Sequence, residues 1–192
     1  MPAREVLLYP DRRLKQVARP AQADEVDGIV ADLLDTLKAV GHGVGIAAPQ
    51  IDVPVRVAVV DVSSHPKAKT SSGLIVLANP RLVEREGSTV GREGCLSLPD
   101  VTANVRRASR VVVEHSGGRV ECEGFEARCV QHEIDQLDGL PFLDRVESLV
   151  DDVFRRKNYA PSAETQSSPP RVTVASPENS PGSEASEPER TG

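Results

Sequence analysis

The sequence predicts an α+β fold, because two amphipathic helical patterns enclose a series of short extended segments. The first helical pattern covers residues 24–40 and the second covers residues 124–138. Between them lie a β-branched apolar run at 55–62 and a hairpin signal at 110–123. Helices at both ends of a set of strands, with a hairpin among the strands, favour antiparallel pairing beside the helices.

The first helix is predicted from apolar residues that recur every three or four positions. Asp24 is the expected N-cap, and Gly41 is expected to end the helix in the left-handed conformation. The apolar positions are Val26, Ile29, Val30, Leu33, Leu34, Leu37 and Val40.

The middle of the chain reads as strands. Residues 55–62 (VRVAVVDV) are β-branched and nearly all apolar, which is typical of a buried strand. Residues 74–77 and 80–84 are further strand candidates, separated from the first by a polar loop. Residues 110–115 and 119–123 flank Ser116-Gly117-Gly118, which indicates a hairpin.

The second helix is predicted over residues 124–138, with Phe125, Val130, Ile134 and Leu137 on one face and Gly139 after its end. Residues 140–146 (LPFLDRV) are expected to be extended. Residues 147–159 are expected to form a short last helix.

Composition limits the class of protein. The chain has 192 residues, 39% of them hydrophobic, with no Trp, so a core must come from Val, Leu, Ile and Ala. Three cysteines give no disulfide framework. The net charge of −6 argues against nucleic-acid binding. The N-terminus has no apolar signal region and no run approaches a membrane span, so the expectation is a cytoplasmic protein without a membrane.

Two regions are predicted: a catalytic domain over 1–160 and a tail over 161–192. The tail is rich in Pro, Ser and Glu and carries five Glu and two Arg. Such a composition buries too little apolar area to offset the entropy of ordering, so we expect disorder there.

Three segments could carry chemistry, and the first is QHEIDQLDG at 131–139. Cys129, His132, Glu133 and Gln136 share one helix face, opposite the apolar one. A metal-binding HExxH helix would have a second histidine at position 136, where this chain has Gln136. The alternative is an ordinary solvated polar face.

The second segment is REGCLSLPD, with Glu93, Cys95 and Ser97. A cysteine beside glycine after a tight turn is able to react or bind a metal; the alternative is a small buried packing residue. The third segment is GHGVGIAAPQ at 41–50. Its bare backbone would let a peptide approach and pair with it, and the Gln50 amide could donate a hydrogen bond. An ordinary Gly-rich turn is the alternative.

Taken together, GVGIAAPQ (43–50), EGCLS (93–97) and QHEIDQLDG (131–139) resemble the peptide deformylase family in kind, order and spacing. The resemblance covers roughly residues 4 to 157. It implies an α+β fold with mixed or antiparallel sheets around a central metal-binding helix. It also implies a metal-dependent hydrolase that removes the formyl group from the initiator N-formylmethionine of nascent polypeptides.

The same resemblance implies roles for individual residues. Cys95 and His132 match metal ligands, and Glu133 matches the catalytic acid and base. Gln50 and the backbone N–H of Leu96 match the donors that stabilise the tetrahedral oxygen. The edge that pairs with the peptide matches Gly43, Val44, Gly45, Ile46 and Ala47. The cofactor implied is one divalent ion, with Fe²⁺ favoured over Zn²⁺, Ni²⁺ and Co²⁺. The implied partners are nascent N-formyl-Met peptides and the bacterial ribosome near its exit tunnel, with the protein a monomer.

Gln136 departs from the family pattern, since a neutral amide oxygen is a poorer ligand than an imidazole for a zinc- or iron-like ion. Gln136 is therefore a weak ligand or none. A set of Cys95, Cys129 and His132 is a less favoured replacement. His42 is expected beside the site as a supporting or surface residue, whereas His65 and His115 are expected to lie far from it.

Two hypotheses follow. In the first, the chain is an active or attenuated deformylase. In the second, it is a catalytically impaired relative that binds N-formylated or nascent peptides. A metalloprotease is weaker than either, because that class needs neither the glycine strip nor Cys95.

Overall fold

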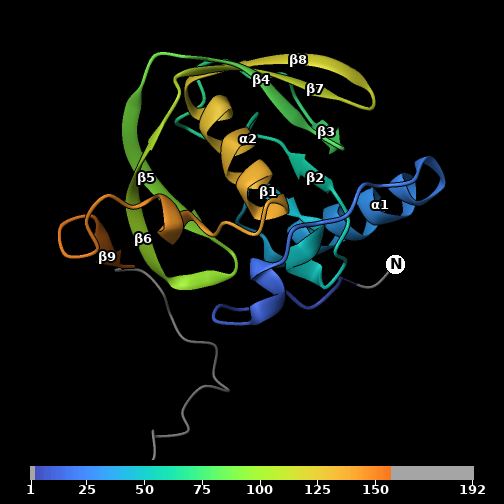
Figure 1. Ribbon diagram of the computed structural model, residues 1–192, viewed down its shortest axis with the longest axis horizontal. Coiled ribbons are helices and arrows are strands. Elements are labelled where there is room, and N and C mark those ends of the chain that lie inside the picture. The colour runs from blue at the N-terminus through green and yellow to red at the C-terminus, as the bar shows by residue number, and fades with distance from the viewer. Residues whose placement is uncertain (1–2, 157–192) are drawn as a thin grey trace, which may run out of the picture. The chain divides into compact units, whose positions relative to one another are not determined.

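The computed structural model describes residues 3–156, in which nine strands form three small antiparallel sheets near two α-helices (Figure 1). The first sheet has the order β1-β2-β3, the second β4-β7-β8 and the third β5-β6-β9. The helices are α1 (Ala23–Val40) and α2 (Gly124–Leu137). The strands are β1 (Gly45–Ala47), β2 (Val57–Val60), β3 (Ile75–Ala78), β4 (Arg81–Glu86), β5 (Thr89–Cys95), β6 (Leu98–Arg107), β7 (Arg110–His115), β8 (Gly118–Glu123) and β9 (Val153–Arg155). The α+β prediction is confirmed.

Helix α1 covers the range that its apolar spacing predicted. It ends as expected, because Gly41 has a φ of 72° and its N–H donates to the Leu37 carbonyl at 3.0 Å. Its start differs: Gln22 is the N-cap, and its backbone N–H donates to the Glu25 carboxylate at 2.8 Å. The prediction of Asp24 as N-cap was therefore wrong, because the helix begins two residues earlier, where the Glu25 carboxylate accepts from the Gln22 N–H.

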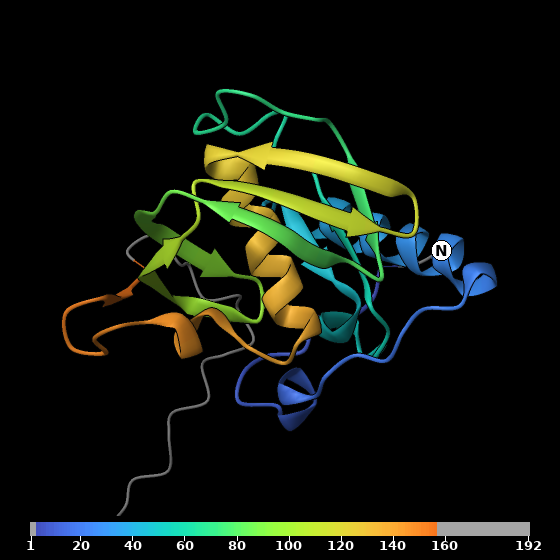
Figure 2. The same ribbon diagram turned by 45° about the horizontal axis from the view of Figure 1, so that its top comes forward.

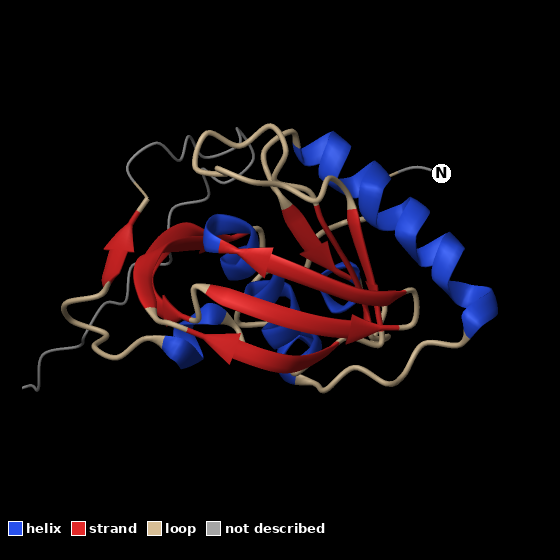
Figure 3. Cartoon of the chain, turned by 90° about the horizontal axis from the view of Figure 1, so that it is seen from above, coloured by secondary structure: helices blue, strands red, loops and turns tan. Residues whose placement is uncertain are grey.

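The β1-β2-β3 sheet lies between the two helices, with α1 along its outer side (Figure 3). All four residues of β2 are buried, because each face of the strand meets a helix. Val57 and Val59 join the apolar cluster beside α1, while Ala58 and Val60 join the cluster around α2. The β-branched run was therefore read correctly as a buried strand, although the strand is shorter than 55–62.

The hairpin of β7 and β8 is confirmed, with His115 paired to Gly118 across the turn. Together with β4 it forms a sheet that lies over α2 (Figure 2). Its inner side contributes Val111 and Val113 to the cluster around α2.

The third sheet places the end of β5 beside α2. A two-residue connection joins β5 to β6, and Cys95 pairs with Leu98 after a register shift at Gly94. Such irregularities often re-aim a side chain near a functional site.

Two predictions for the last part of the chain were wrong. Residues 140–146 were expected to be extended, but Phe142–Arg145 form a 3₁₀ turn that buries Phe142 against the third sheet. Residues 147–159 were expected to be helical, but 153–155 form β9, which pairs with the edge of β6. An unpaired strand edge supplies backbone partners that local sequence does not reveal.

Helix α2 is enclosed by the sheets around it. Every residue from Glu126 to Leu137 is buried, including the polar face that sequence alone allowed to be solvated. Buried polar groups require hydrogen-bond partners, so this helix must meet polar side chains from other elements.

The predicted tail, residues 161–192, lies outside the described residues, and its disorder stays a prediction. Within residues 3–156, neither helix combines the length and apolar character that crossing a membrane requires.

Candidate metal centre

The residues singled out in the three sequence segments meet at the centre of the molecule. Helix α2 carries His132, Glu133 and Gln136, Cys95 ends β5, and Gln50 lies in the turn that follows β1. All five side chains are buried. Tertiary structure thus unites segments that are far apart in the chain.

The sulfur of Cys95 lies between two amides. Gln136 Nε2 donates to Cys95 Sγ at 3.1 Å, and Gln50 Nε2 donates to it at 3.3 Å. The Gln50 amide is fixed further, because its Nε2 also donates to Ser97 Oγ at 3.1 Å and its Oε1 accepts from the Ala47 N–H at 2.9 Å. Its carboxamide is thereby oriented in advance toward the sulfur.

His132 is oriented by a buried carboxylate. Its Nδ1 lies 2.9 Å from Glu93 Oε2, which leaves Nε2 as the nitrogen directed away from Glu93. Carboxylates in this position fix the ring and tautomer of metal-binding histidines. Glu93 comes two residues before Cys95 on β5, so strand alternation brings both side chains to the same face.

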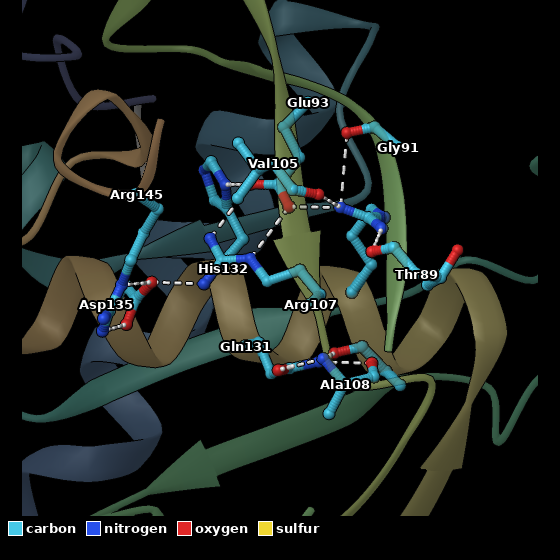
Figure 4. Close-up of polar contacts among 12 residues, drawn as sticks. Thr89, Gly91, Glu93, Val105, Arg107, Ala108, Gln131, His132, Asp135 and Arg145 are labelled. Carbon is cyan, nitrogen blue, oxygen red and sulfur yellow. Dashed lines mark hydrogen bonds and ion pairs between the residues drawn. The ribbon is translucent and has the colours of Figure 1, made fainter. Parts of the chain in front are cut away.

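Two arginines hold Glu93 in place (Figure 4). Arg107 Nε and Arg128 Nη1 each lie 2.9 Å from Glu93 Oε1. Arg107 also pairs with Asp135 of α2, and Asp135 in turn accepts from Arg145 at 2.7 Å. This ion-pair network joins β5, β6 and α2 beneath the site.

The network changes the acidity of its members. Burial acts to raise the pKa of Glu93, but the hydrogen bonds from His132 and Arg107 outweigh it and lower that pKa to about 2. Burial opposes protonation of His132, yet Cys95 and Glu93 together raise its pKa well above the usual range. Glu93 is therefore ionised and able to orient the imidazole.

Replacing Arg107 by Met should reduce the free energy of unfolding by about 3–5 kcal/mol, because Glu93 and Asp135 would remain buried with less compensation. Urea unfolding followed by circular dichroism measures the change. Arg106→Met is the matched control: Arg106 immediately precedes Arg107 on β6, is exposed, and pairs with Glu147 at the surface. This control should change the free energy of unfolding by no more than about 0.5 kcal/mol. Equal effects of the two variants would contradict the buried network.

Glu133 follows His132 on α2, and its side chain is buried. Its Oε2 has no hydrogen-bond partner among the described residues. Burial raises its pKa to about 7. A carboxyl group with a pKa near neutrality can both accept and donate a proton at physiological pH, which is what a catalytic acid and base requires.

Gly45 gives Glu133 its space. A Cβ at position 45 would lie 2.7 Å from Glu133 Oε1, closer than real Cβ atoms come. The absence of a side chain at this point of β1 is therefore a condition for the position of the carboxylate.

Gly45→Ala should lower kcat by about 10- to 100-fold through displacement of Glu133. Gly28→Ala is the control, because nothing lies within 4 Å of a Cβ added at that point of α1. It should keep kcat and stabilise the fold by about 0.5–1 kcal/mol. Steady-state kinetics and thermal unfolding measure both; an unchanged kcat in Gly45→Ala would show that Glu133 tolerates the shift.

A cavity of ≈420 Å³ opens onto these groups. The glycine strip and the end of β5 line it, and Cys95, His132 and Glu133 lie within its lining. β1 is an edge strand whose partner is β2, so its other edge has no strand beside it among the described residues. Of the predicted strip, Gly43, Val44 and Gly45 line the cavity, whereas Ile46 and Ala47 are buried in the core.

The donors present fit a divalent metal in part. A thiolate and an imidazole are good ligands for iron- or zinc-like ions. Within residues 3–156, however, no three His, Cys, Asp or Glu side chains gather as a metal site requires. The third position is the amide of Gln136, whose nitrogen faces the sulfur.

The less favoured ligand set of Cys95, Cys129 and His132 is contradicted by that same absence of a three-residue cluster in the described chain. Cys129 belongs to the apolar cluster around α2, and burial raises the pKa of its thiol. Cys129 therefore packs in this cluster, with part of its side chain at the wall of the cavity.

The other histidines divide differently from the prediction. His65 was expected to lie far from the site, but it lines the cavity and stacks on Phe125 with ring centroids 4.3 Å apart. The loop that carries it folds back over the start of α2, which its polar sequence did not indicate. His42 lines the cavity as an exposed residue, and His115 lies in the distant hairpin, both as expected.

Sequence reasoning missed the supporting network. For Glu93 the usable sequence signal is its spacing of two residues from Cys95, which places both side chains on one face of a strand. No sequence signal pointed to Arg107 or Arg128, because they come from separate elements and meet Glu93 only in the folded chain.

Comparison with known proteins places these features in a family. A sequence profile described as polypeptide deformylase matches residues 3–152. A peptide deformylase of Thermodesulfovibrio yellowstonii is 40% identical over 161 residues, covering 80% of this chain and 94% of the relative. A peptide deformylase of Alkalilimnicola ehrlichii is 40% identical over 160 residues, covering 80% and 87%.

Solved structures of peptide deformylases are also similar to this chain. A class I type b peptide deformylase of Acinetobacter baumannii with Met-Ala-Ser bound has a TM-score of 0.67 at 34% identity, covering 75% of this chain and 98% of that one. A peptide deformylase of Synechococcus elongatus in complex with actinonin has a TM-score of 0.69 at 32% identity, covering 78% and 82%.

Proposed function

The chain belongs to the polypeptide deformylase family, and we propose how its own residues perform the reaction of that family. The family consists of metal-dependent hydrolases that remove the N-formyl group from nascent polypeptides. The observation that carries the proposal is the meeting of Cys95, His132, Glu133 and Gln50 around one cavity. The impaired, peptide-binding alternative is not favoured, because the matching relatives at 40% identity are named as deformylases.

We assign the metal to Cys95 and His132, with Gln136 a weak ligand or a bystander. Fe²⁺ is the favoured ion, with Zn²⁺, Ni²⁺ and Co²⁺ as alternatives that accept the same donors. When bound, the metal supplies Lewis acidity that polarises the formyl carbonyl and water. Glu93 keeps the His132 ring in the orientation needed for binding.

The substrate peptide is proposed to lie along the open edge of β1, where backbone groups can pair with it. A deformylase with Met-Ala-Ser bound is among the similar structures, which supports a peptide in this cavity. Gly43, Val44 and Gly45 are the lining part of that edge.

Proton transfer is assigned to Glu133. It takes the proton from the attacking water and gives it to the departing amine, and its pKa of about 7 suits both steps. Gln50 Nε2 and the Leu96 N–H are assigned to the oxygen of the tetrahedral intermediate. Removing one such donor typically lowers kcat by about 10²–10³-fold.

The same proposal covers the setting of the reaction. The substrates are nascent N-formyl-Met chains in the bacterial cytoplasm. The protein acts on them as a monomer near the ribosomal exit tunnel.

The test is metal content measured beside activity. The protein is purified without oxygen, its iron, nickel and zinc are quantified, and formyl-Met-Ala-Ser hydrolysis is assayed in the same sample. Close to one metal per chain together with turnover is the expected result. Absence of turnover after each metal is added back would overturn the proposal and restore the peptide-binding alternative.

A further inference from the structure

Three cationic side chains line the cavity around the candidate metal centre. Arg92 extends from β5, Lys67 comes from the loop before β3, and Arg156 follows β9. We refer to these three residues as the basic rim.

The rim cations differ from the arginines beneath the site. Arg107 and Arg128 are buried and paired with Glu93, whereas no residue of the rim forms an ion pair within residues 3–156. Lys67 and Arg92 are exposed, and Arg156 is partly exposed. Their charges are therefore available to a ligand in the cavity.

Neutral contacts position two of these cations. The Arg92 guanidinium carbon lies 3.5 Å from the centroid of the Phe154 ring, and its Nη1 donates to Thr102 Oγ1 at 3.1 Å. Lys67 Nζ lies 5.9 Å from the centroid of Phe125. Aromatic rings orient a cation without neutralising it.

Arg156 lies against the strand that carries Cys95. Its guanidinium occupies the space that a Cβ at Gly94 would fill, one residue before Cys95. Arg156 therefore lines the cavity on its β5 side, beside the residue that precedes Cys95.

The cavity lining contains fewer carboxylates than cationic side chains. The lining contains Glu93 and Glu133, and both are buried. Glu93 is already compensated by Arg107 and Arg128. A peptide that runs between the β1 edge and β5 therefore passes a surface of excess positive charge.

We propose that the basic rim makes this deformylase selective for formyl-Met peptides with Asp or Glu among the residues that follow the methionine. This inference rests on the proposed function, and it adds a class of substrate to it. Because the cations are solvent-exposed, the selectivity is electrostatic and decreases with ionic strength.

The test compares formyl-Met-Glu-Glu-Ala, formyl-Met-Gln-Gln-Ala and formyl-Met-Lys-Lys-Ala on the full chain loaded with metal. We expect KM for the Glu peptide to be about fivefold lower than for the Gln peptide, and KM for the Lys peptide to be higher than both. The difference should shrink toward equality in about 0.5 M salt.

Single substitutions Lys67→Gln, Arg92→Gln and Arg156→Gln should each reduce the preference for Glu over Gln by about twofold. Arg81→Gln is the matched control, because Arg81 is an exposed arginine on β4 that pairs with Glu114 and does not line the cavity. It should leave the preference intact. If Arg81→Gln loses the preference for Glu over Gln while the three rim variants keep it, the assignment to the basic rim is contradicted.

Binding of the deformylated products, measured by calorimetry, separates this inference from the function on which it rests. Tighter binding of Met-Glu-Glu-Ala than of Met-Gln-Gln-Ala supports the rim even if no formyl peptide is hydrolysed, an outcome that would refute only the proposed function. Equal KM values and equal product affinities would overturn the inference while leaving deformylation in place.

Discussion

Glu133→Gln should lower the rate of formyl-Met-Ala-Ser hydrolysis by about 10²–10⁴-fold while leaving the fold at least as stable as the unmodified chain. An amide of the same shape cannot shuttle the proton. It also does not carry the cost of a buried carboxyl group whose Oε2 lacks a partner among the described residues. Loss of turnover with no loss of stability is the signature expected of a group kept for chemistry.

Glu126→Gln on the same helix supplies the matched control. Glu126 is also buried, but its carboxylate accepts from the Ser72 N–H at 2.7 Å and from Ser72 Oγ at 3.0 Å. This variant should keep turnover and lose about 1 kcal/mol of stability. Kinetics and thermal unfolding on both variants give opposite patterns. Turnover within tenfold of the parent in Glu133→Gln would remove Glu133 from the reaction.

Gln136→His should increase metal affinity by roughly 10- to 100-fold and raise turnover with it, because an imidazole replaces a neutral amide beside Cys95 and His132. Gln136 is almost fully buried, and its Nε2 lies 3.1 Å from Cys95 Sγ, so a ring at this position would face the Cys95 sulfur. Competition with a chelator of known affinity measures metal retention, and the peptide assay measures turnover.

Gln136→Leu is the companion variant, since it removes the amide and supplies no donor. If the amide contributes to metal binding, this variant should retain less metal than the parent. If it retains as much, Gln136 is a bystander. Unchanged metal affinity in Gln136→His would show that position 136 does not limit the site.

The local features of the fold were predictable because interactions between residues close in sequence produce them. Helix α1 follows from apolar spacing and a terminal Gly41, and the β7–β8 hairpin follows from two strand-forming runs around Ser116-Gly117-Gly118. The segments 147–159 and 140–146 were predicted wrongly. There the conformation depends on pairing with the β6 edge and on burial of Phe142, which are contacts made over a distance in the chain.

By itself, the sequence determined the family, the two helices, the main hairpin and the segments that carry the chemistry. These are encoded in short motifs and in periodicity, which can be recognised without knowledge of the fold. It also showed that Gln136 stands where a histidine ligand would be expected.

Only the tertiary structure decided how those segments support one another. It buried the polar face of α2, paired Glu93 with His132 and two arginines, directed Gln136 toward Cys95, and brought Lys67, Arg92 and Arg156 to one cavity. The physical reason is that a buried charge or donor must find its partner in space. The partners here come from strands and loops that no local pattern connects.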